Sequence, residues 1–343
     1  MTLRVGMIGL GAIHRAHILG YERAGGEASL VAVCDSDGAK AAAVAAKLGT
    51  KSYTNYLELF DSGEIDAVDI LLPHHLHVAA VTAAIGAGLH VLVEKPAAPT
   101  AKAISELEAL ARARNVVLAV AENTRFVEAY GAVHRILEAG TLGTVEVVRT
   151  MVCGNATDRL RTVTDWKGRR DGTLGGVIYD SGAHSFYLLE WLFGGVTELR
   201  AIGAKRVAES EVEDFAVVVG KLGGGAEFLT EYTFTAEIPW SERLEVYGSS
   251  GSVIVDQLAD PVVKIYGSGQ DWTGHSDPKV PFAPDKWKMN SIAEEVLDFV
   301  HAINGHRPHA VSLEDIKVTM SIVEAAYKSM DSGSSLVNIP REE

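Results

Sequence analysis

Short apolar runs alternate with amphipathic stretches along the first third of the chain. The apolar runs have the length of buried strands and lie at residues 3–8, 30–34, 67–72, 90–94 and 116–120. The stretches between them are rich in alanine and have helical spacing, at 13–24, 39–48, 77–87 and 100–114, with a shorter candidate helix at 55–60. Strands that alternate with helices build βαβ units with right-handed crossovers, which place a parallel sheet between two helical layers. We therefore expect an α/β domain over residues 1–122, with the doubly wound parallel sheet of a Rossmann fold.

The pattern changes after residue 122. A predicted helix at 133–139 leads into a strand at 144–153, and an amphipathic helix follows at 182–193. Runs punctuated by glycine turns then predict strands at 214–221, 226–234, 243–247, 252–255 and 262–266. We expect a long loop at residues 267–285, followed by two final helices at 291–303 and 312–332. We expect residues 123–343 to form an α+β domain with a large, mostly antiparallel open sheet, and the helix at 312–332 to pack back on the first domain.

Composition narrows the class of protein. The 343 residues are enough for two cores, and no stretch reaches the roughly 20 apolar residues of a membrane helix. The first eight residues have no signal-peptide pattern, and Cys34 and Cys153 are expected to be buried free thiols, so we expect a cytoplasmic protein. The net charge of −14 is spread along the chain and argues against a nucleic-acid partner, which would need a basic surface.

Two glycines directly follow the first predicted strand, in the run Gly9-Leu-Gly11-Ala-Ile-His14. Gly9 would allow a tight turn, and Gly11 would let the backbone approach a pyrophosphate at the N-terminus of the next helix. His14 replaces the usual third glycine or alanine of this dinucleotide-binding pattern. The competing interpretation is a strand–helix turn that binds no ligand.

Asp35 ends the second predicted strand, 24 residues after Gly11. This is close to the spacing of the acid that accepts hydrogen bonds from the adenosine ribose of a dinucleotide. A carboxylate there would repel a 2′-phosphate, which favours NAD over NADP. The competing interpretation is an aspartate that caps the following helix.

Glu94, Lys95 and Pro96 stand at the end of a buried strand. Open α/β sheets bind ligands beyond the carboxyl ends of their strands, so the strand would deliver this charged pair to a binding crevice. A Glu-Lys pair is more often a solvated surface feature, but here it follows an apolar run directly.

Asp180 and His184 are four residues apart, after the glycines Gly175 and Gly176. On a helix they would share one face, where histidine could remove a hydroxyl proton and the carboxylate could orient it. The glycines would allow a ligand to approach closely. A helix-capping aspartate and a buried histidine explain the spacing equally well.

These motifs, in this order, resemble the Gfo/Idh/MocA family of glucose–fructose oxidoreductase, inositol dehydrogenase and rhizopine-catabolism proteins. The resemblance covers nearly the whole chain and is carried by motifs at 9–17, 34–35, 72–77, 88–96, 123–126, 166–169, 180–184, 248–251 and 325–329. The Glu-Lys-Pro and Asp-x-x-x-His motifs are the specific part. In that family the N-terminal domain holds NAD or NADP, and the C-terminal sheet often mediates oligomers.

The resemblance also implies roles for individual residues. His184 would take the hydroxyl proton as hydride leaves the substrate for nicotinamide C4, while Lys95, assisted by Asp180, would hold the substrate oxygen. The residues implied to bind the cofactor are Gly9, Gly11, Ala12, Ile13, Asp35, Ser36, Leu72, Pro73, His74, His77, Glu94, Lys95, Asn123 and Arg125. Those implied to bind substrate are Lys95, Arg125, Asn155, Trp166, Arg169, Asp180 and His184.

Two departures from the family pattern concern His14, in the glycine turn, and Lys167, where many relatives have an arginine after the tryptophan. The loop at 154–173 is expected to select the substrate. His74, His75 and His77 invite a metal interpretation, but no cysteine or carboxylate is spaced to complete a site, so we expect none.

We therefore expect an NAD-dependent dehydrogenase, with NADP less favoured, acting on a secondary alcohol of a sugar, inositol or related polyol. The first alternative is a glycosidase or epimerase that oxidises its substrate transiently and retains its NAD. The second is a non-catalytic nucleotide-binding sensor. The expected partners are a small-molecule substrate and, through the C-terminal sheet, further copies in a homodimer or homotetramer.

Overall fold

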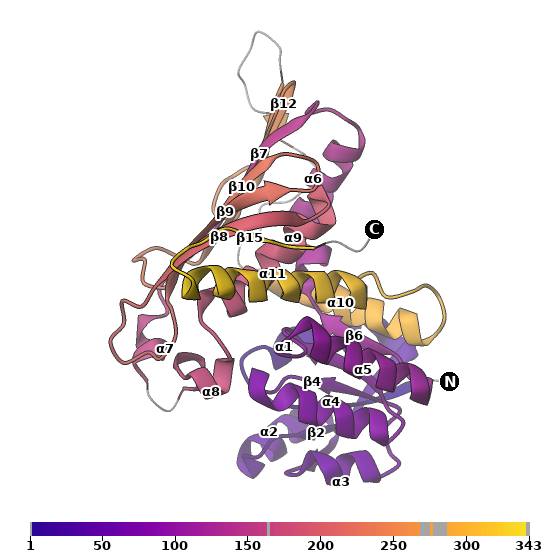
Figure 1. The fold of residues 1–343 in the computed structure, drawn as a ribbon. Helices are drawn as coiled ribbons and strands as arrows, with labels where there is room; N and C mark the ends of the chain where they lie inside the picture. The colour runs from indigo at the N-terminus through magenta and orange to yellow at the C-terminus, as the bar shows by residue number, and fades with distance from the viewer. Residues whose placement is uncertain (1, 163–164, 268–274, 277–286, 341–343) are drawn as a thin grey trace. The chain divides into compact units, whose positions relative to one another are not determined.

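The computed structural model describes residues 2–162, 165–267, 275–276 and 287–340 (Figure 1). The chain divides into two compact units. The first comprises Met1–Phe126 and Lys288–Lys317, and the second comprises Val127–Trp287 and Val318–Glu343. Along the described ranges, every helix is too short or too polar to cross a membrane.

The first unit contains a six-stranded sheet in the order β3-β2-β1-β4-β5-β6, and all of its strand pairs are parallel. The strands are β1 Leu3–Ile8, β2 Ala28–Cys34, β3 Lys51–Tyr53, β4 Ala67–Ile70, β5 His90–Glu94 and β6 Leu118–Ala121. The helices between them are α1 His14–Ala24, α2 Gly38–Leu48, α3 Tyr56–Asp61, α4 His77–Gly86 and α5 Ala101–Arg114. The predicted doubly wound α/β fold is confirmed, and the short, exposed β3 is the one strand of this sheet that the sequence pattern did not predict.

Strands β2 and β3 lie on one side of β1 in the sheet, and β4, β5 and β6 lie on the other, so the strand order reverses between β1 and β4. Ile8 at the end of β1 is paired with Ile70 at the end of β4, so both strands stop at the same edge of the sheet. The chain leaves β1 toward α1 and leaves β4 toward α4. Crossover connections that diverge in this way leave a crevice beyond the carboxyl ends of the two strands, which is where open α/β sheets bind their ligands.

Helix α10, Trp287–Ile303, lies far along the chain but contributes to the core of the first unit. Its side chains Val296, Phe299 and Val300 are fully buried in one cluster with Val5 and Met7 of β1. The expected second domain spans residues 123–343, whereas residues 123–126 and 288–317 belong to the first unit. Helical spacing shows that one face of α10 is buried, but it does not show which sheet that face covers.

The second unit is built on a nine-stranded sheet in the order β14-β13-β12-β11-β7-β10-β9-β8-β15. Its strands are β7 Val145–Cys153, β8 Val196–Ala204, β9 Phe215–Leu222, β10 Glu227–Thr233, β11 Ser241–Gly248, β12 Gly251–Asp256, β13 Val263–Gly267, β14 His275–Ser276 and β15 Val337–Asn338. Only the β7–β10 pair among the described strands is parallel, which confirms the mostly antiparallel prediction. Of the predicted loop at 267–285, residues 268–274 and 277–285 lie outside the described residues.

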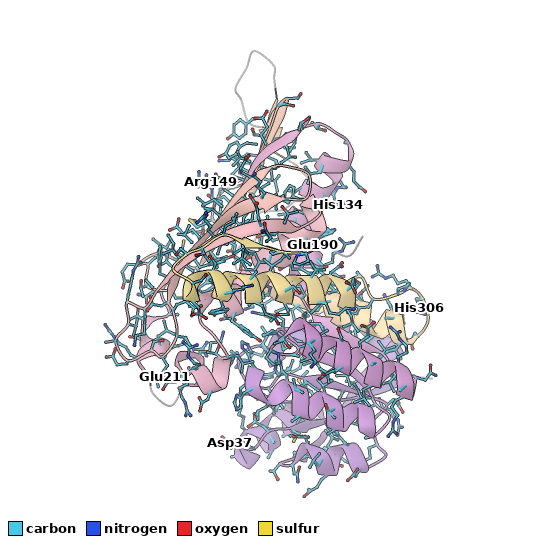
Figure 2. All side chains as sticks on the ribbon, in the orientation of Figure 1. Asp37, His134, Arg149, Glu190, Glu211 and His306 are labelled. Atoms are coloured by element: carbon cyan, nitrogen blue, oxygen red, sulfur yellow. The ribbon has the colours of Figure 1, made fainter. Side chains whose placement is uncertain are left out.

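Helices cover one face of this sheet and leave the other open. The helices of the second unit are α6 Glu128–Glu138, α7 Thr157–Arg161, α8 Arg170–Thr173, α9 Ala183–Phe193 and most of α11 Leu313–Asp331. Helices α6 and α9 lie on one side of the strands (Figure 1), and Arg149 of β7 points to the other side (Figure 2). The alternation along β7 agrees, because Val148 and Val152 are buried whereas Val147 and Arg149 are exposed.

Candidate active site

The first unit collects most of the predicted cofactor residues at the carboxyl edge of its sheet. Gly9, Gly11, Ala12 and Ile13 follow β1; Asp35 and Ser36 follow β2; Leu72, Pro73, His74 and His77 follow β4; Glu94 and Lys95 end or follow β5; Asn123 and Arg125 follow β6. Because β2, β1, β4, β5 and β6 are neighbours in the sheet, these segments are neighbours too. The parallel topology thus assembles one continuous edge from residues that are up to a third of the chain apart.

The glycine turn after β1 has the shape that a phosphate group needs. Gly9 has a φ of 87°, and a Cβ on it would lie 2.5 Å from the Leu71 carbonyl oxygen, so a side chain is excluded there. A Cβ on Gly11 would meet nothing within 4 Å, which leaves open space over the turn. Helix α1 then begins without a side-chain cap at Ile13, so the backbone N–H groups of its first turn are not used by a capping side chain.

Asp35 is held as a carboxylate beside this turn. It accepts hydrogen bonds from the backbone N–H of Leu10 at 2.8 Å, the N–H of Asp37 at 3.0 Å and the Lys40 ammonium at 2.7 Å. Burial raises the pKa of Asp35, but these donors outweigh burial and lower it below its ordinary value. The cap of α2 is Asp37 and not Asp35, so the competing capping interpretation of Asp35 is wrong.

The segments after β4 and β5 are tied together by His77. One of its ring nitrogens lies 2.8 Å from the Pro96 carbonyl oxygen, and the other lies 2.7 Å from the Leu72 carbonyl oxygen. The ring is fully buried, and burial lowers the pKa of His77. His77 therefore links the backbone after β4 to the backbone after β5, and in the described structure its ring nitrogens face protein atoms.

A buried charge network lies behind Glu94 and was not predicted as part of the site. The fully buried ring of His17, on α1, lies with Nδ1 2.9 Å from Asp69 and with Nε2 3.3 Å from Glu94. The Tyr21 hydroxyl donates to Asp69 at 3.1 Å, and the Lys95 backbone N–H donates to Glu94 at 3.1 Å. Burial disfavours a charged imidazole, but the two carboxylates outweigh it and raise the pKa of His17 well above 6.5. Burial also raises the pKa of Glu94, yet His17 chiefly brings it down to about 2, so Glu94 is ionised at any working pH.

In the second unit, Asp180 lies within a π-helical turn, Ile178–Gly182, that leads directly into α9 and His184. Wide turns of this kind are rare and occur often at functional sites. Asp180 is mostly buried and accepts a hydrogen bond from the Lys167 ammonium at 2.7 Å. Lys167 also lies over the Trp166 ring, 5.5 Å from its centroid. Lys167, which departs from the family pattern, therefore donates to the predicted catalytic carboxylate.

The glycines before this turn serve the protein rather than a ligand. A Cβ on Gly175 would lie 2.2 Å from the Tyr327 hydroxyl, and one on Gly176 would lie 1.9 Å from the Glu213 carbonyl oxygen. The partly buried Glu213 carboxylate accepts from the Gly176 N–H at 3.1 Å and from the Tyr327 hydroxyl at 2.7 Å. We expected these glycines to leave room for a ligand, but Glu213 and Tyr327 occupy that space. These two side chains contact the backbone just before the π-helical turn.

Several other predicted site residues have protein partners. The Asn123 amide donates to Ser291 at 2.7 Å, and the Asn155 amide donates to Glu237 at 2.6 Å. The Arg169 guanidinium forms an exposed ion pair with Asp171. Within the described residues, potential metal ligands come together in two groups, His17 with Glu94 and Glu295, and Glu27 with His301 and His306; neither contains His74, His75 or His77.

Comparison with known proteins decides the family. Residues 3–122 match an oxidoreductase family with an NAD-binding Rossmann fold, and residues 130–254 match the Gfo/Idh/MocA C-terminal domain. The chain is similar to trans-1,2-dihydrobenzene-1,2-diol dehydrogenase from Bos taurus, with 30% identity over 264 residues that cover 76% of this chain and 74% of the relative. The chain belongs to the Gfo/Idh/MocA family.

Two further comparisons extend over the whole chain of this Gfo/Idh/MocA protein. Myo-inositol 2-dehydrogenase from Thermotoga maritima is 26% identical over 340 residues, which cover 97% of this chain and 98% of the relative. Levoglucosan dehydrogenase, solved in complex with NADH and levoglucosan, has a TM-score of 0.89, covers 99% of this chain and 100% of its own, and is 21% identical. The sequence resemblance is thereby confirmed, as are the oxidoreductase class and the NAD-binding Rossmann fold.

The first unit of this Gfo/Idh/MocA protein fits a dinucleotide on its own geometry. Open space above Gly11 and the uncapped start of α1 suit a pyrophosphate, and the ionised Asp35 beside that turn suits a ribose diol. Glu94 ends β5 and Lys95 follows it. Strand β4 separates β5 from β1, so this pair lies beyond the point where the strand order reverses. Sequence reasoning singled out these residues because strand ends and glycines are visible locally. It missed Asp69, Glu213 and Glu295, for which only the apolar setting of a charged residue gives any signal.

Proposed function

We propose that this protein is an NAD-dependent dehydrogenase that oxidises a secondary alcohol of a sugar, inositol or related polyol. The observation that carries the proposal is the edge of the first sheet, where an ionised Asp35, an uncapped helix start and the Glu94-Lys95 pair stand in one row. The names of the relatives support the substrate class, because they act on an inositol, a cyclic diol and an anhydrosugar.

The residues of the first unit would bind and orient the cofactor. Asp35 accepts hydrogen bonds from the adenosine ribose, and the N–H groups at the start of α1 hold the pyrophosphate. Glu94, ionised and fixed by His17, accepts from the nicotinamide ribose. When bound, the nicotinamide supplies the hydride acceptor, at its C4 atom. The carboxylate of Asp35 disfavours a 2′-phosphate, so we propose NAD rather than NADP.

The chemical step would use three side chains. Lys95 holds the substrate hydroxyl oxygen and stabilises negative charge that develops on it. His184 accepts the hydroxyl proton as general base, and Asp180 orients the groups around that oxygen. Lys167 keeps Asp180 in place through its 2.7 Å hydrogen bond. In the reverse direction the same groups would deliver the proton to a ketone.

The test is a screen of NADH formation over inositols, aldoses, anhydrosugars and trans-dihydrodiols, followed by mass spectrometry of the product. We expect one NADH for each alcohol converted to a ketone, with a product two hydrogens lighter. A hydrolysed or epimerised product without net NADH would instead establish the transient-oxidation alternative. Binding of NAD without any turnover across the whole screen would favour the sensor.

We also propose that copies of the chain associate through the open face of the second sheet. This face exposes apolar side chains on three strands, with Val147 at 36%, Val219 at 39% and Ile202 at 58% exposure. Apolar groups gathered on one open sheet face favour burial against a partner. Light scattering of the purified protein should give the mass of a dimer or tetramer, and Ile202→Lys should lower it. A monomeric mass at micromolar concentration would contradict this assembly.

A further inference from the structure

The inference concerns Glu295, a residue of α10 that no motif singles out. Its side chain is fully buried within the first unit, and neither carboxylate oxygen has a hydrogen-bond partner among the residues that the structure describes. A carboxylate without donors in such a place is among the least stable ways to bury a charge. The same group carrying a proton is neutral and tolerates the site far better.

The neighbours of Glu295 strengthen this argument. One Glu295 oxygen, one Glu94 oxygen and a ring nitrogen of His17 all lie within 4.8 Å of one another. His17 already compensates two carboxylates, Asp69 on one ring nitrogen and Glu94 on the other. A charged Glu295 would therefore add a negative charge that the single imidazolium cannot offset.

The charged and titratable groups that act on Glu295 come from every strand and helix around it. They are His17 and Tyr21 of α1, Asp69 of β4, Glu94 of β5, and Glu122, which follows β6. The positive charge of Lys288, at the start of α10, acts on Glu94. Apart from His17 and Lys288, these groups are acidic or neutral. Burial is the largest cause that raises the pKa of Glu295 well above its ordinary value, and the negative charge of Glu94 is the next.

We propose that Glu295 carries a proton at neutral pH and acts as a positioning residue, which leaves Glu94 as the single carboxylate of the pair and directs its charge toward the nicotinamide ribose. This role rests on the proposed function only in naming the ribose as the group that Glu94 meets. The protonation state itself depends on the buried network alone. The Glu94–Glu295 pair then holds one negative charge instead of two beside His17, whose imidazolium also faces Asp69.

The first experiment reads the proton directly and needs no enzyme activity. A protonated carboxylic acid has an infrared carbonyl band that is distinct from the bands of a carboxylate. We expect this band in wild-type protein at pH 7 and its loss in Glu295→Gln, whose amide mimics the neutral acid. Absence of the band, or its persistence in Glu295→Gln, would overturn the proposal. So would one equivalent of a divalent metal in the wild type that Glu295→Gln lacks, because the three atoms would then be ligands.

The second experiment tests the positioning role through NADH affinity, measured by fluorescence titration as the pH is raised. In the wild type, deprotonation of Glu295 at alkaline pH places a second charge beside Glu94 and should weaken NADH binding, whereas Glu295→Gln should bind NADH equally well from about pH 6 to 9. At pH 7 the two proteins should agree within about twofold, while Glu94→Gln should bind about tenfold more weakly because a charged acceptor is lost. Parallel curves for wild type and Glu295→Gln would overturn the positioning role. If the wild type does not bind NADH at all, the proposed function fails, and the infrared result still decides the proton on Glu295.

Discussion

The predicted site carboxylates Asp35 and Glu94 in the first unit and Asp180 in the second unit have different donors. In the first unit, Asp35 and Glu94 stand at strand ends, and backbone N–H groups of Leu10 and Lys95 donate to them. In the second unit, Asp180 stands in a π-helical turn and accepts a hydrogen bond from the Lys167 side chain. Backbone donors are fixed by the fold itself, whereas a lysine contact can be altered by one substitution.

This difference separates cofactor binding from chemistry and substrate choice. The parallel sheet supplies the dinucleotide-binding edge through its topology, so substitutions there should change cofactor affinity or selectivity. Substitutions at residues 155–162 and 165–182 of the second unit should change turnover and substrate range instead. Lys95 connects the two roles, because it follows a strand of the first unit but is proposed to act on the substrate.

The largest effect is expected for Lys95→Ala. If Lys95 stabilises charge on the substrate oxygen, its loss should abolish turnover while the dissociation constant for NADH changes by less than about threefold. Steady-state kinetics and a fluorescence titration with NADH measure the two quantities. Normal turnover at saturating NAD, combined with weakened NAD binding, would make Lys95 a cofactor residue only.

His184→Ala should lower kcat by roughly 10²–10⁴, the range for loss of a general base. The pH–rate profile should also change its shape, because the proposed general base contributes to that profile. Wild-type protein with the same substrate is the control. A profile of unchanged shape in the variant would remove His184 as the base, whatever the size of the rate loss.

The sequence showed the first unit better than the second for a physical reason. Strands β1 and β5 have the predicted bounds, because parallel strands buried on both faces leave continuous apolar runs. Contacts between distant residues leave no such mark: His17 and Glu94 are 77 positions apart, and Tyr327 and Glu213 are 114 apart. The position of α10 in the first unit was missed for the same reason, since an amphipathic pattern does not identify its partner.

Lys167→Met tests the view that a side-chain contact positions Asp180. We expect kcat to fall by about 10- to 100-fold, the effect of removing a hydrogen bond to a charged group, with little change in the KM for NAD. Lys167→Arg, which keeps the charge and a donor, should recover most of the activity. Equal losses in both variants, or a large fall in the melting temperature of Lys167→Met, would indicate a structural role instead.

The smallest effect is expected for Asp35→Ser, at the carboxyl edge of the parallel sheet. Asp35→Ser removes a carboxylate that accepts from Leu10 and Lys40, and it leaves the Lys40 ammonium beside the glycine turn without its anionic partner. A 2′-phosphate would then meet a cation where it previously met an anion, so the ratio of kcat/KM for NAD to that for NADP should fall by about tenfold or more. Asp37→Ser is the matched control, because Asp37 caps α2 and serine is also a good cap. If Asp35→Ser lowers activity with both cofactors equally, the carboxylate supports the turn and does not select the ribose, and the backbone alone would account for dinucleotide binding in the first unit.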